Sequence, residues 1–387
     1  MTPQLAPCRA CGAAVELIAE FPPLPALANV FRETEAAARA VRLGPFRLVM
    51  CTECTLLAND AFAADLVEYD PEYENSLHFS GAFSAFTDAL VDGLIDRYDL
   101  AGHEIVEVGC GKGDFLVQLC RTADAHGIGY DPSSPDQSPD PRVRFTRDHF
   151  SADLPLGDAA LVATRHVLEH LEDPRGFLAT IATPLIRSQA ALYVEVPDAT
   201  YMLETVGLWD LIHEHVTYFT GPALQRLAGS VGLETLRQES VFGGQFLALE
   251  ARARTGPLPA PDDLAERERL WKLGAAFGAN ATAAIEQWRS RIDTWSAAGE
   301  RIMLWGAGSK GVTFANLVDP DRRIAAIVDV NPRKWNRYVP GSGHPILGPD
   351  DLRDESPTVV VVMNPQYRDE IQADLTNRGI TATVEGV

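Results

Sequence analysis

The sequence predicts an α/β protein with a small cysteine-containing region at its N-terminus and two later units that each begin with a strand. Two pairs of cysteines lie close to the N-terminus. Segments 104–119 and 301–318 each read as a strand, a glycine loop and a helix. A chain of 387 residues, of which 46% are hydrophobic, can bury more than one core, so we expect two or three domains.

Charge and apolar patterning exclude two classes of partner. The formal net charge is -21, whereas binding to nucleic acid needs clustered Lys and Arg to contact phosphates. No apolar run approaches the length of a membrane span, and the N-terminal MTPQLAPCRACG lacks the basic and apolar regions of a signal peptide. We therefore expect a cytoplasmic protein that acts on a small molecule, with no nucleic acid and no membrane as partner.

The N-terminal cysteines predict a structural zinc site. Cys8 pairs with Cys11 and Cys51 pairs with Cys54 in two C-x-x-C motifs, which can bring four thiolates around one Zn²⁺ in a tetrahedron. Two disulfides or a chance pattern are the alternatives, but a reducing cytoplasm disfavours disulfides. Four sulfur ligands leave no position for water on the metal, so we expect zinc to stabilise the fold and not to take part in catalysis.

The segment HEIVEVGCGKGDFLVQLC predicts a cofactor loop. Residues 104–108 read as a strand that contains Glu107, and a helix follows the loop. The loop glycines are Gly109, Gly111 and Gly113. Such a loop lets a ligand approach the backbone. A second strand, in HGIGYDPS, ends at Asp131, about twenty residues downstream, the offset at which an acidic residue binds ribose in dinucleotide-binding folds.

The order E-x-G-x-G-x-G resembles motif I of class I S-adenosylmethionine-dependent methyltransferases and differs from the G-x-G-x-x-G of nicotinamide enzymes. The resemblance implies a Rossmann-like core that binds S-adenosylmethionine. It implies that Glu107 orients the amino end of the cofactor, that the loop glycines pack beside it and that Asp131 holds the ribose. Asp148, in FTRDHF, lies near the position at which such enzymes contact adenine.

The segment TRHVLEHLEDP has two interpretations. His166, Glu169 and His170 match the inverted zinc-protease pattern H-x-x-E-H, which would indicate a hydrolase. However, AALVATRHV reads as a strand that places His166 at its carboxyl end and not on a helix face shared with His170. The segment also resembles the H-V-L-E-H-L-x-D-P signature of many class I methyltransferases. The resemblance implies that His166 borders the cleft for cofactor and substrate, whereas Glu169 and His170 cap and pack.

Two further segments are expected at the same cleft. AALYVEVPDATYM reads as a strand that ends near Glu195 and Asp198. Because ligands of open α/β sheets bind beyond the carboxyl ends of strands, we expect both acidic residues to contact the substrate. DLIHEHVTYF, residues 210–219, should reach this cleft too. Its His213 and His215 are two residues apart, which excludes the helical H-E-x-x-H zinc motif and would place both on one side only of an extended chain.

The composition changes after residue 254. TGPLPAPDD, residues 255–263, reads as a proline-rich connector, and 264–299 reads as a long helical stretch that glycine and asparagine interrupt only weakly. ERIMLWGAGSKGVTFANLV then repeats strand, glycine loop and helix, and IAAIVDVNP ends in Asp329. The loop glycines are Gly306, Gly308 and Gly311. This fingerprint alone predicts a nicotinamide-dependent oxidoreductase, the main rival from a different chemistry.

The order of these segments resembles the nucleotide-sugar C-methyltransferases, typified by the C-3′-methyltransferases of deoxysugar biosynthesis, over essentially the whole chain. The segments are the four cysteines, the methyltransferase core, HEH..YF, GGQFLALE and LWGAGSKG. The resemblance implies a zinc-binding domain at 1–70, an S-adenosylmethionine-dependent methyltransferase domain at 71–255, and a helical linker with a second Rossmann-like, substrate-binding domain at 256–387. The implied reaction is C-methylation of a nucleotide-linked 4-ketosugar through an enolate, with a dTDP-4-keto-deoxysugar methylated at C-3 as the expected substrate.

In that family a Glu-His pair carries the chemistry, and it maps onto Glu214 and His215, with His215 as the base. Tyr73, in YENSLHF, matches a tyrosine of the family site. Ile212 stands where the family commonly has a tyrosine, and structural and functional interpretations of the adjacent His213 have equal weight.

The resemblance also implies that the C-terminal domain encloses the nucleotide-sugar. Ser309 and Lys310 begin its first helix and suit a pyrophosphate, although glycines that only permit close packing are the alternative.

The residue types suit this chemistry, because a ketone acidifies the adjacent C–H and a histidine with a near-neutral pKa can remove that proton. An O- or N-methyltransferase acting on another small metabolite is the alternative enzyme. A cofactor-binding scaffold without turnover is the non-enzymatic alternative.

Overall fold

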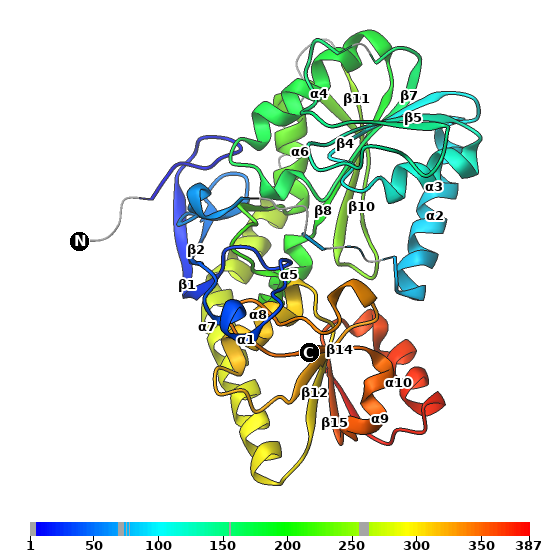
Figure 1. Cartoon of the computed structure of the whole chain (residues 1–387). Helices are drawn as coiled ribbons and strands as arrows, with labels where there is room; N and C mark the ends of the chain where they lie inside the picture. Colours follow the sequence, from blue (N-terminus) through cyan, green and yellow to red (C-terminus); the bar gives the residue numbers. More distant parts are fainter. Residues whose placement is uncertain (1–4, 69–72, 75, 77, 155, 255–262) are drawn as a thin grey trace.

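Strands in the computed structural model form three sheets across the described residues, which are 5–68, 73–74, 76, 78–154, 156–254 and 263–387. The second sheet lies above the third in Figure 1, and the first sheet lies to one side of both. Most of the predicted connector, residues 255–262, lies outside the described residues. None of the helices in the described ranges has the length and apolar character needed to cross a membrane.

The first sheet is antiparallel and joins the N-terminal region to the DLIHEHVTYF segment. Its strand order is β1 (Val15–Pro25), β2 (Leu43–Cys51), β3 (Leu57–Asn59) and β9 (Thr217–Tyr218), and α1 (Glu35–Arg39) lies between β1 and β2 in the chain. Because this sheet takes strands from both sides of residue 70, the predicted domain limits stay a prediction.

The second sheet has the strand order β10-β11-β8-β7-β4-β5-β6. Its strands are β4 (Glu104–Val108), β5 (His126–Tyr130), β6 (Val143–Thr146), β7 (Ala159–Arg165), β8 (Ala191–Pro197), β10 (Leu233–Val241) and β11 (Phe246–Ala253). The five strands from β8 to β6 are parallel, whereas β11 and β10 are antiparallel additions. Alternation along β4 sends Ile105 and Val106 to opposite faces, so each face packs its own core. Helices α2 (Gly81–Tyr98) and α3 (Asp114–Ala123) cover one face, and α4 (Pro174–Ser188) and α6 (Gly221–Ser230) cover the other.

The third sheet is wholly parallel, in the order β14-β13-β12-β15-β16. The strands are β12 (Ile302–Trp305), β13 (Ala326–Val328), β14 (Ile346–Leu347), β15 (Val359–Val362) and β16 (Thr383–Gly386). The helices are α8 (Ser309–Val318), α9 (Leu352–Glu355) and α10 (Arg368–Asn377). The predicted repeat of strand, glycine loop and helix is therefore β12, its loop and α8.

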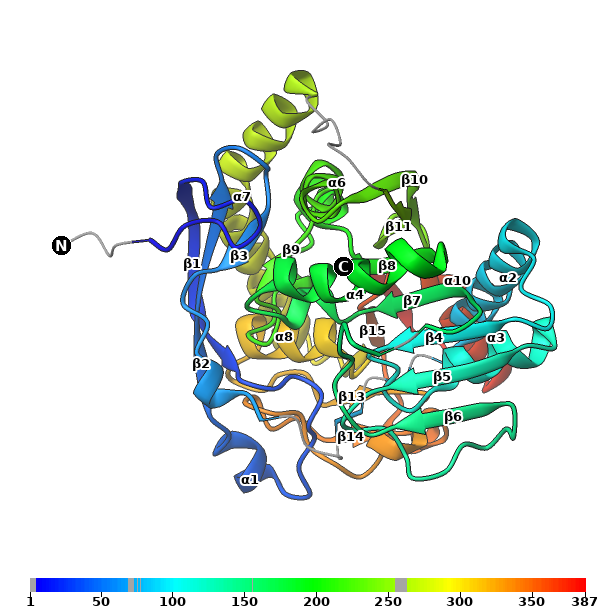
Figure 2. The ribbon, with the colours of Figure 1, turned by 90° about the horizontal axis from the view of Figure 1, so that it is seen from above.

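Helix α7 (Leu264–Ala297) runs beside the first sheet, as Figure 2 shows from above, and reaches the third. Its buried side chains, among them Leu270 and Phe277, belong to one apolar core with residues of β2 and of α8. A Cβ at Gly278 would lie 2.6 Å from the carbonyl oxygen of Ile18. This glycine, which the sequence suggested as a weak interruption, lets α7 approach β1 closely, so the first and third sheets are held on one helix.

Candidate active site

The four N-terminal cysteines converge as predicted. The Sγ atoms of Cys8 and Cys54 are 3.6 Å apart, those of Cys11 and Cys51 are 3.5 Å apart, and all four lie within 4.8 Å of one another. The backbone N–H groups of Glu53 and Cys54 both donate to the Cys51 sulfur at 3.4 Å, which favours a thiolate there. None of the four, all of which lie in the described part of the chain, forms a disulfide. The donor set and its compactness fit one tetrahedral metal ion.

The first glycine loop is shaped to admit a ligand at Gly111. This residue has a positive φ of 52°, and a Cβ added there would meet nothing within 4 Å. At Gly109 an added Cβ would collide with Val167, so that glycine serves packing. Asp131 follows β5, and its carboxylate accepts the Gly111 N–H at 3.0 Å and the Ser133 N–H at 2.7 Å. Asp131 therefore fixes the conformation of this loop.

Two other predicted cofactor residues lie at different depths. Glu107 is buried in β4, and burial raises the pKa of its carboxyl to about 8. Asp148 is exposed two residues beyond β6, and its Oδ1 accepts the N–H of His149. Gly113 is the N-cap residue of α3.

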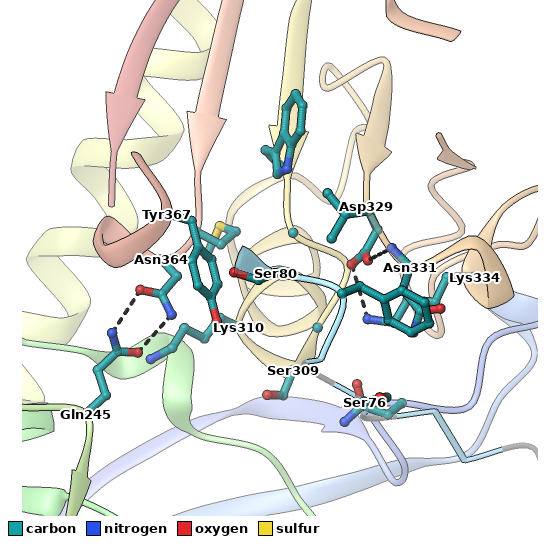
Figure 3. A pocket seen from close by; sticks show the side chains of 18 of the residues that line it. Ser76, Ser80, Gln245, Ser309, Lys310, Asp329, Asn331, Lys334, Asn364 and Tyr367 are labelled. Atoms are coloured by element: carbon teal, nitrogen blue, oxygen red, sulfur yellow. Dashed lines mark hydrogen bonds and ion pairs between the residues drawn. The ribbon is translucent and has the colours of Figure 1, made fainter. Parts of the chain in front are cut away.

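A cavity of about 600 Å³ has walls from the second and third sheets and from loops, among them the loop beyond β1 that contains Asn29. Tyr73, His166 and His215 line it, and so do residues of the second glycine loop. Figure 3 shows Ser309 and Lys310 at this cavity, together with a pair of amides that donate to each other, Gln245 and Asn364.

Beside this cavity, the buried Glu214 pairs with the half-buried Tyr73. The Tyr73 hydroxyl donates to Glu214 Oε1 at 2.9 Å, and the backbone N–H of Ala28 donates to Oε2 at 3.1 Å. Glu214 is 1% exposed, and its burial raises the pKa of the carboxyl to about 7. The carboxyl thus sits near the midpoint of its titration at neutral pH.

His215 lines the cavity next to this pair. Burial lowers its pKa well below the ordinary value, and the neighbouring His170, His166 and Lys310 lower it further. Its ring meets the ring of His170 edge-on, with centroids 4.7 Å apart. His215 is therefore neutral at pH 7 and able to accept a proton.

Glu169 and His170 do more than the capping and packing that the sequence analysis expected of them. His166 lines the cavity just after β7, as predicted, but so do Glu169 and His170. The N–H of Val216 donates to the Glu169 carbonyl at 2.8 Å, and His170 Nδ1 lies 3.1 Å from the Glu214 carbonyl. These contacts join two segments that are more than 40 residues apart in the chain. No local pattern in the sequence predicts this contact.

The prediction that Glu195 and Asp198 contact the substrate stays a prediction, and the partners of both carboxylates do not favour it. Glu195 is 0% exposed, and its carboxylate is bound by Arg165 at 2.7 Å and by the Tyr193 hydroxyl at 2.6 Å. Although burial opposes ionisation, Arg165 and His166 hold the pKa of Glu195 at about 2. Asp198 is the N-cap residue of α5 (Ala199–Thr205), accepts from Thr200 N–H and Ser240 Oγ, and lies outside the cavity. Both carboxylates already have internal partners.

His213 points away from His215. Its ring stacks on Phe62 with centroids 5.3 Å apart, and its Nδ1 lies 3.1 Å from the Pro45 carbonyl. The segment turns at residues 213 and 214 instead of staying extended, so the two histidines do not share a side. Ile212 also lines the cavity.

The second glycine loop lacks a free ribose-binding carboxylate. Asp329 is 7% exposed, and its Oδ2 accepts the Ala307 N–H at 2.8 Å and pairs with Lys334 Nζ at 3.1 Å. A Cβ at Gly311 would lie 1.9 Å from the Gly306 carbonyl oxygen, so this glycine permits close packing of α8 on the loop. Ser309 and Lys310 line the cavity, and Lys310 is ion-paired with Asp210.

Glu74 connects the two glycine-loop units beside Tyr73. Its carboxylate accepts from Lys112 Nζ in the first loop at 2.6 Å, and from Asn331 Nδ2 and an Arg333 nitrogen at 3.1 and 3.4 Å. Sequence reasoning missed Glu74, although it adjoins a predicted site residue.

Comparison with known proteins agrees with this architecture. A model of a methyltransferase domain matches residues 83–238, and a model of the C-methyltransferase C-terminal domain matches residues 245–381. C-methyltransferase NovU of Streptomyces niveus is 25% identical over 392 residues, which cover 94% of this chain and 90% of the relative. The chain is an S-adenosylmethionine-dependent methyltransferase. More narrowly, the chain is related over nearly its whole length to a C-methyltransferase.

Solved structures resemble only part of the chain. Magnesium protoporphyrin IX methyltransferase from Synechocystis, with bound S-adenosylhomocysteine, is 19% identical with a TM-score of 0.35, and the match covers 45% of this chain and 84% of that one. Geranyl diphosphate C-methyltransferase from Streptomyces coelicolor is 14% identical with a TM-score of 0.32, covering 43% and 77%. At TM-scores this low, neither likeness adds to the functional argument.

Proposed function

We propose that this enzyme methylates a carbon atom of a nucleotide-linked 4-ketosugar, with a dTDP-4-keto-deoxysugar and its C-3 as the expected substrate and position. The observation that carries the proposal is the neutral His215 beside the Tyr73–Glu214 pair, in a cavity large enough for a nucleotide-sugar. Carbon methylation needs a base that forms a carbon nucleophile, and the relationship to C-methyltransferases agrees with that need.

The proposed roles follow from the geometry around His215. His215 removes the proton from the carbon beside the ketone, and the C–H electron pair becomes the enolate. The Tyr73 hydroxyl and Glu214, which is close to half protonated at neutral pH, supply hydrogen bonds to the enolate oxygen or to a sugar hydroxyl. His170 holds the His215 ring from its edge.

S-adenosylmethionine supplies an electrophilic methyl group when it is bound at the first glycine loop. We propose that it lies against Gly111, with Gly109 and Gly113 shaping the loop and Asp131 facing the ribose. The buried Glu107 would orient the amino end of the cofactor, and the exposed Asp148 would contact its adenine. His166 would border the methyl group that is transferred.

The second glycine loop is proposed to hold the substrate's diphosphate through Ser309, Lys310 and the N-terminus of α8. An NAD(P)-dependent reaction is disfavoured here, because the Asp329 carboxylate that would bind a ribose is buried and already paired with Lys334.

The four cysteines are proposed to bind one structural Zn²⁺, in a cytoplasm that keeps the thiols reduced. The site packs into the same apolar core as one face of the second sheet, so the metal would stabilise the fold of that region.

Mass spectrometry tests the proposed reaction. A panel of nucleotide-linked 4-ketosugars incubated with the enzyme and S-adenosylmethionine should yield a product heavier by one methyl group, and NMR should locate that group on carbon. A methyl group found on oxygen or nitrogen would favour the alternative in which His215 deprotonates a heteroatom. A lack of product across the panel would refute the proposed substrate class.

A further inference from the structure

One carboxylate oxygen at the cavity has no role in the chemistry described so far. Glu169 is 1% exposed, and its Oε2 has no hydrogen-bond partner among the described residues. A buried oxygen without a hydrogen-bond partner costs free energy, so its presence at this position needs an explanation. One oxygen of Glu169, one nitrogen of His170 and one nitrogen of His215 all lie within 4.8 Å of one another.

The backbone fixes Glu169 against the histidine. The short helix η2 (Leu168–His170) receives the Val216 N–H on the Glu169 carbonyl at 2.8 Å. His170 Nδ1 lies 3.1 Å from the Glu214 carbonyl on the same stretch. The Glu169 carboxylate is therefore held next to His215, at a separation that one water molecule can bridge.

On its other side, Glu169 meets His166. Glu169 Oε1 lies 3.5 Å from His166 Nδ1, and His166 Nε2 lies 3.0 Å from Glu195 Oε1. Burial disfavours a charged His166, but its hydrogen bonds to Glu169 and Glu195 outweigh this and raise its pKa to about 9. Both side chains line the cavity, but that of His166 is 28% exposed and that of Glu169 only 2%. His166 thus connects Glu169 to solvent.

The chemistry requires a route for one proton in every turnover. The substrate C–H bond breaks, its electron pair forms the new C–C bond, and the proton is left on His215. The sulfonium charge disappears when the methyl group leaves the cofactor, so the proton is a net product that must reach solvent before His215 can act again. Burial lowers the pKa of His215, which agrees with a base that gives its proton away readily.

We propose that Glu169 receives the proton that His215 removes from the substrate, and that His166 releases its own proton to water in the cavity before it accepts the one held by Glu169. This inference rests on the proposed C-methylation and adds the route by which the base is reset. Glu169 acts through His215, so its removal should slow the return of the base and not the first proton abstraction.

Rapid-quench kinetics of Glu169→Gln tests the route. With a nucleotide-linked 4-ketosugar and S-adenosylmethionine, the variant should form one methylated product per active site at a rate within about twofold of the wild type. Steady-state turnover should then fall on the order of a hundredfold, giving a burst that the wild type lacks. Glu172→Gln, which changes an exposed carboxylate two residues beyond the same short helix, is the matched control and should show wild-type kinetics.

A second variant guards against a loss of folding. Glu169→Asp keeps an acid and should restore most of the steady-state rate. Equal loss of the first turnover and of the steady state in Glu169→Gln, with an unchanged melting temperature, would overturn the route but leave C-methylation standing. Wild-type kinetics in Glu169→Gln would also overturn it. Absence of methylated product from the wild-type enzyme would overturn the proposed function and the route together.

Discussion

Replacing Glu214 by Gln should change how the stability of the protein depends on pH. In the folded protein the pKa of Glu214 is raised by burial from 4.5 to about 7. Between these two values the unfolded chain releases the proton while the folded protein keeps it, so ionisation favours unfolding as the pH rises. The penalty is complete above pH 7, where the difference in pKa corresponds to about 3 kcal/mol.

Glutamine cannot ionise, so Glu214→Gln should escape this penalty. It replaces one of the two oxygens that accept from Tyr73 and Ala28, which costs about 1 kcal/mol at every pH. Urea unfolding of both proteins from pH 5 to pH 9 measures the difference in unfolding free energy. That difference should shift by about 3 kcal/mol in favour of the variant over this range. A difference that stays constant with pH would refute the reasoning, because Glu214 would then titrate alike in both states.

Three other changes test separate parts of the site. Cys51→Ser should abolish binding of one Zn²⁺ per chain, measured by metal analysis, and lower the melting temperature, whereas wild-type protein without stoichiometric zinc would contradict the metal site. Gly111→Ala should lower the free energy of unfolding by only about 1 kcal/mol, the cost of a positive φ for alanine. It should nevertheless lose most of its affinity for S-adenosylhomocysteine in calorimetry, because the added Cβ would enter the space proposed for the cofactor. Unchanged affinity would place the cofactor elsewhere. Lys310→Met should raise the KM for the nucleotide-sugar with little change in kcat, and an unchanged KM would leave the second glycine loop with a packing role alone.

The parts of the fold that the sequence predicted well are those with local signals. Residues 104–108 form β4 as expected, because a β-branched run before a glycine loop admits few other conformations. The long helix follows from 264 to 297, close to the predicted stretch. The four cysteines meet because each C-x-x-C pair makes its own turn.

The direction of side chains is what the sequence could not predict. The rule that ligands bind beyond the carboxyl ends of parallel strands located the end of β8 correctly. It could not show that Glu195 points toward Arg165, or that Asp198 caps a helix of its own. In the same way, the buried pairing of Asp329 with Lys334 depends on a loop conformation that the glycine fingerprint does not determine.

Long-range contacts explain what the sequence missed. Glu169 and His170 reach the cavity through hydrogen bonds to the segment at 214–216, and Glu74 contacts both the first glycine loop and the loop after β13. No periodicity connects these positions. His213, which two interpretations left open, packs on Phe62 because the chain turns between the two histidines.

Hydrogen exchange at the substrate carbon tests the central claim most directly. A nucleotide-linked 4-ketosugar held in D₂O with the enzyme and S-adenosylhomocysteine cannot be methylated, so any deuterium at the carbon beside the ketone reports the base alone. We predict rapid exchange with the wild type and with His213→Ala, and exchange slowed on the order of a thousandfold with His215→Ala. Exchange that persists in His215→Ala would contradict the assignment of His215 as the base that forms the carbon nucleophile.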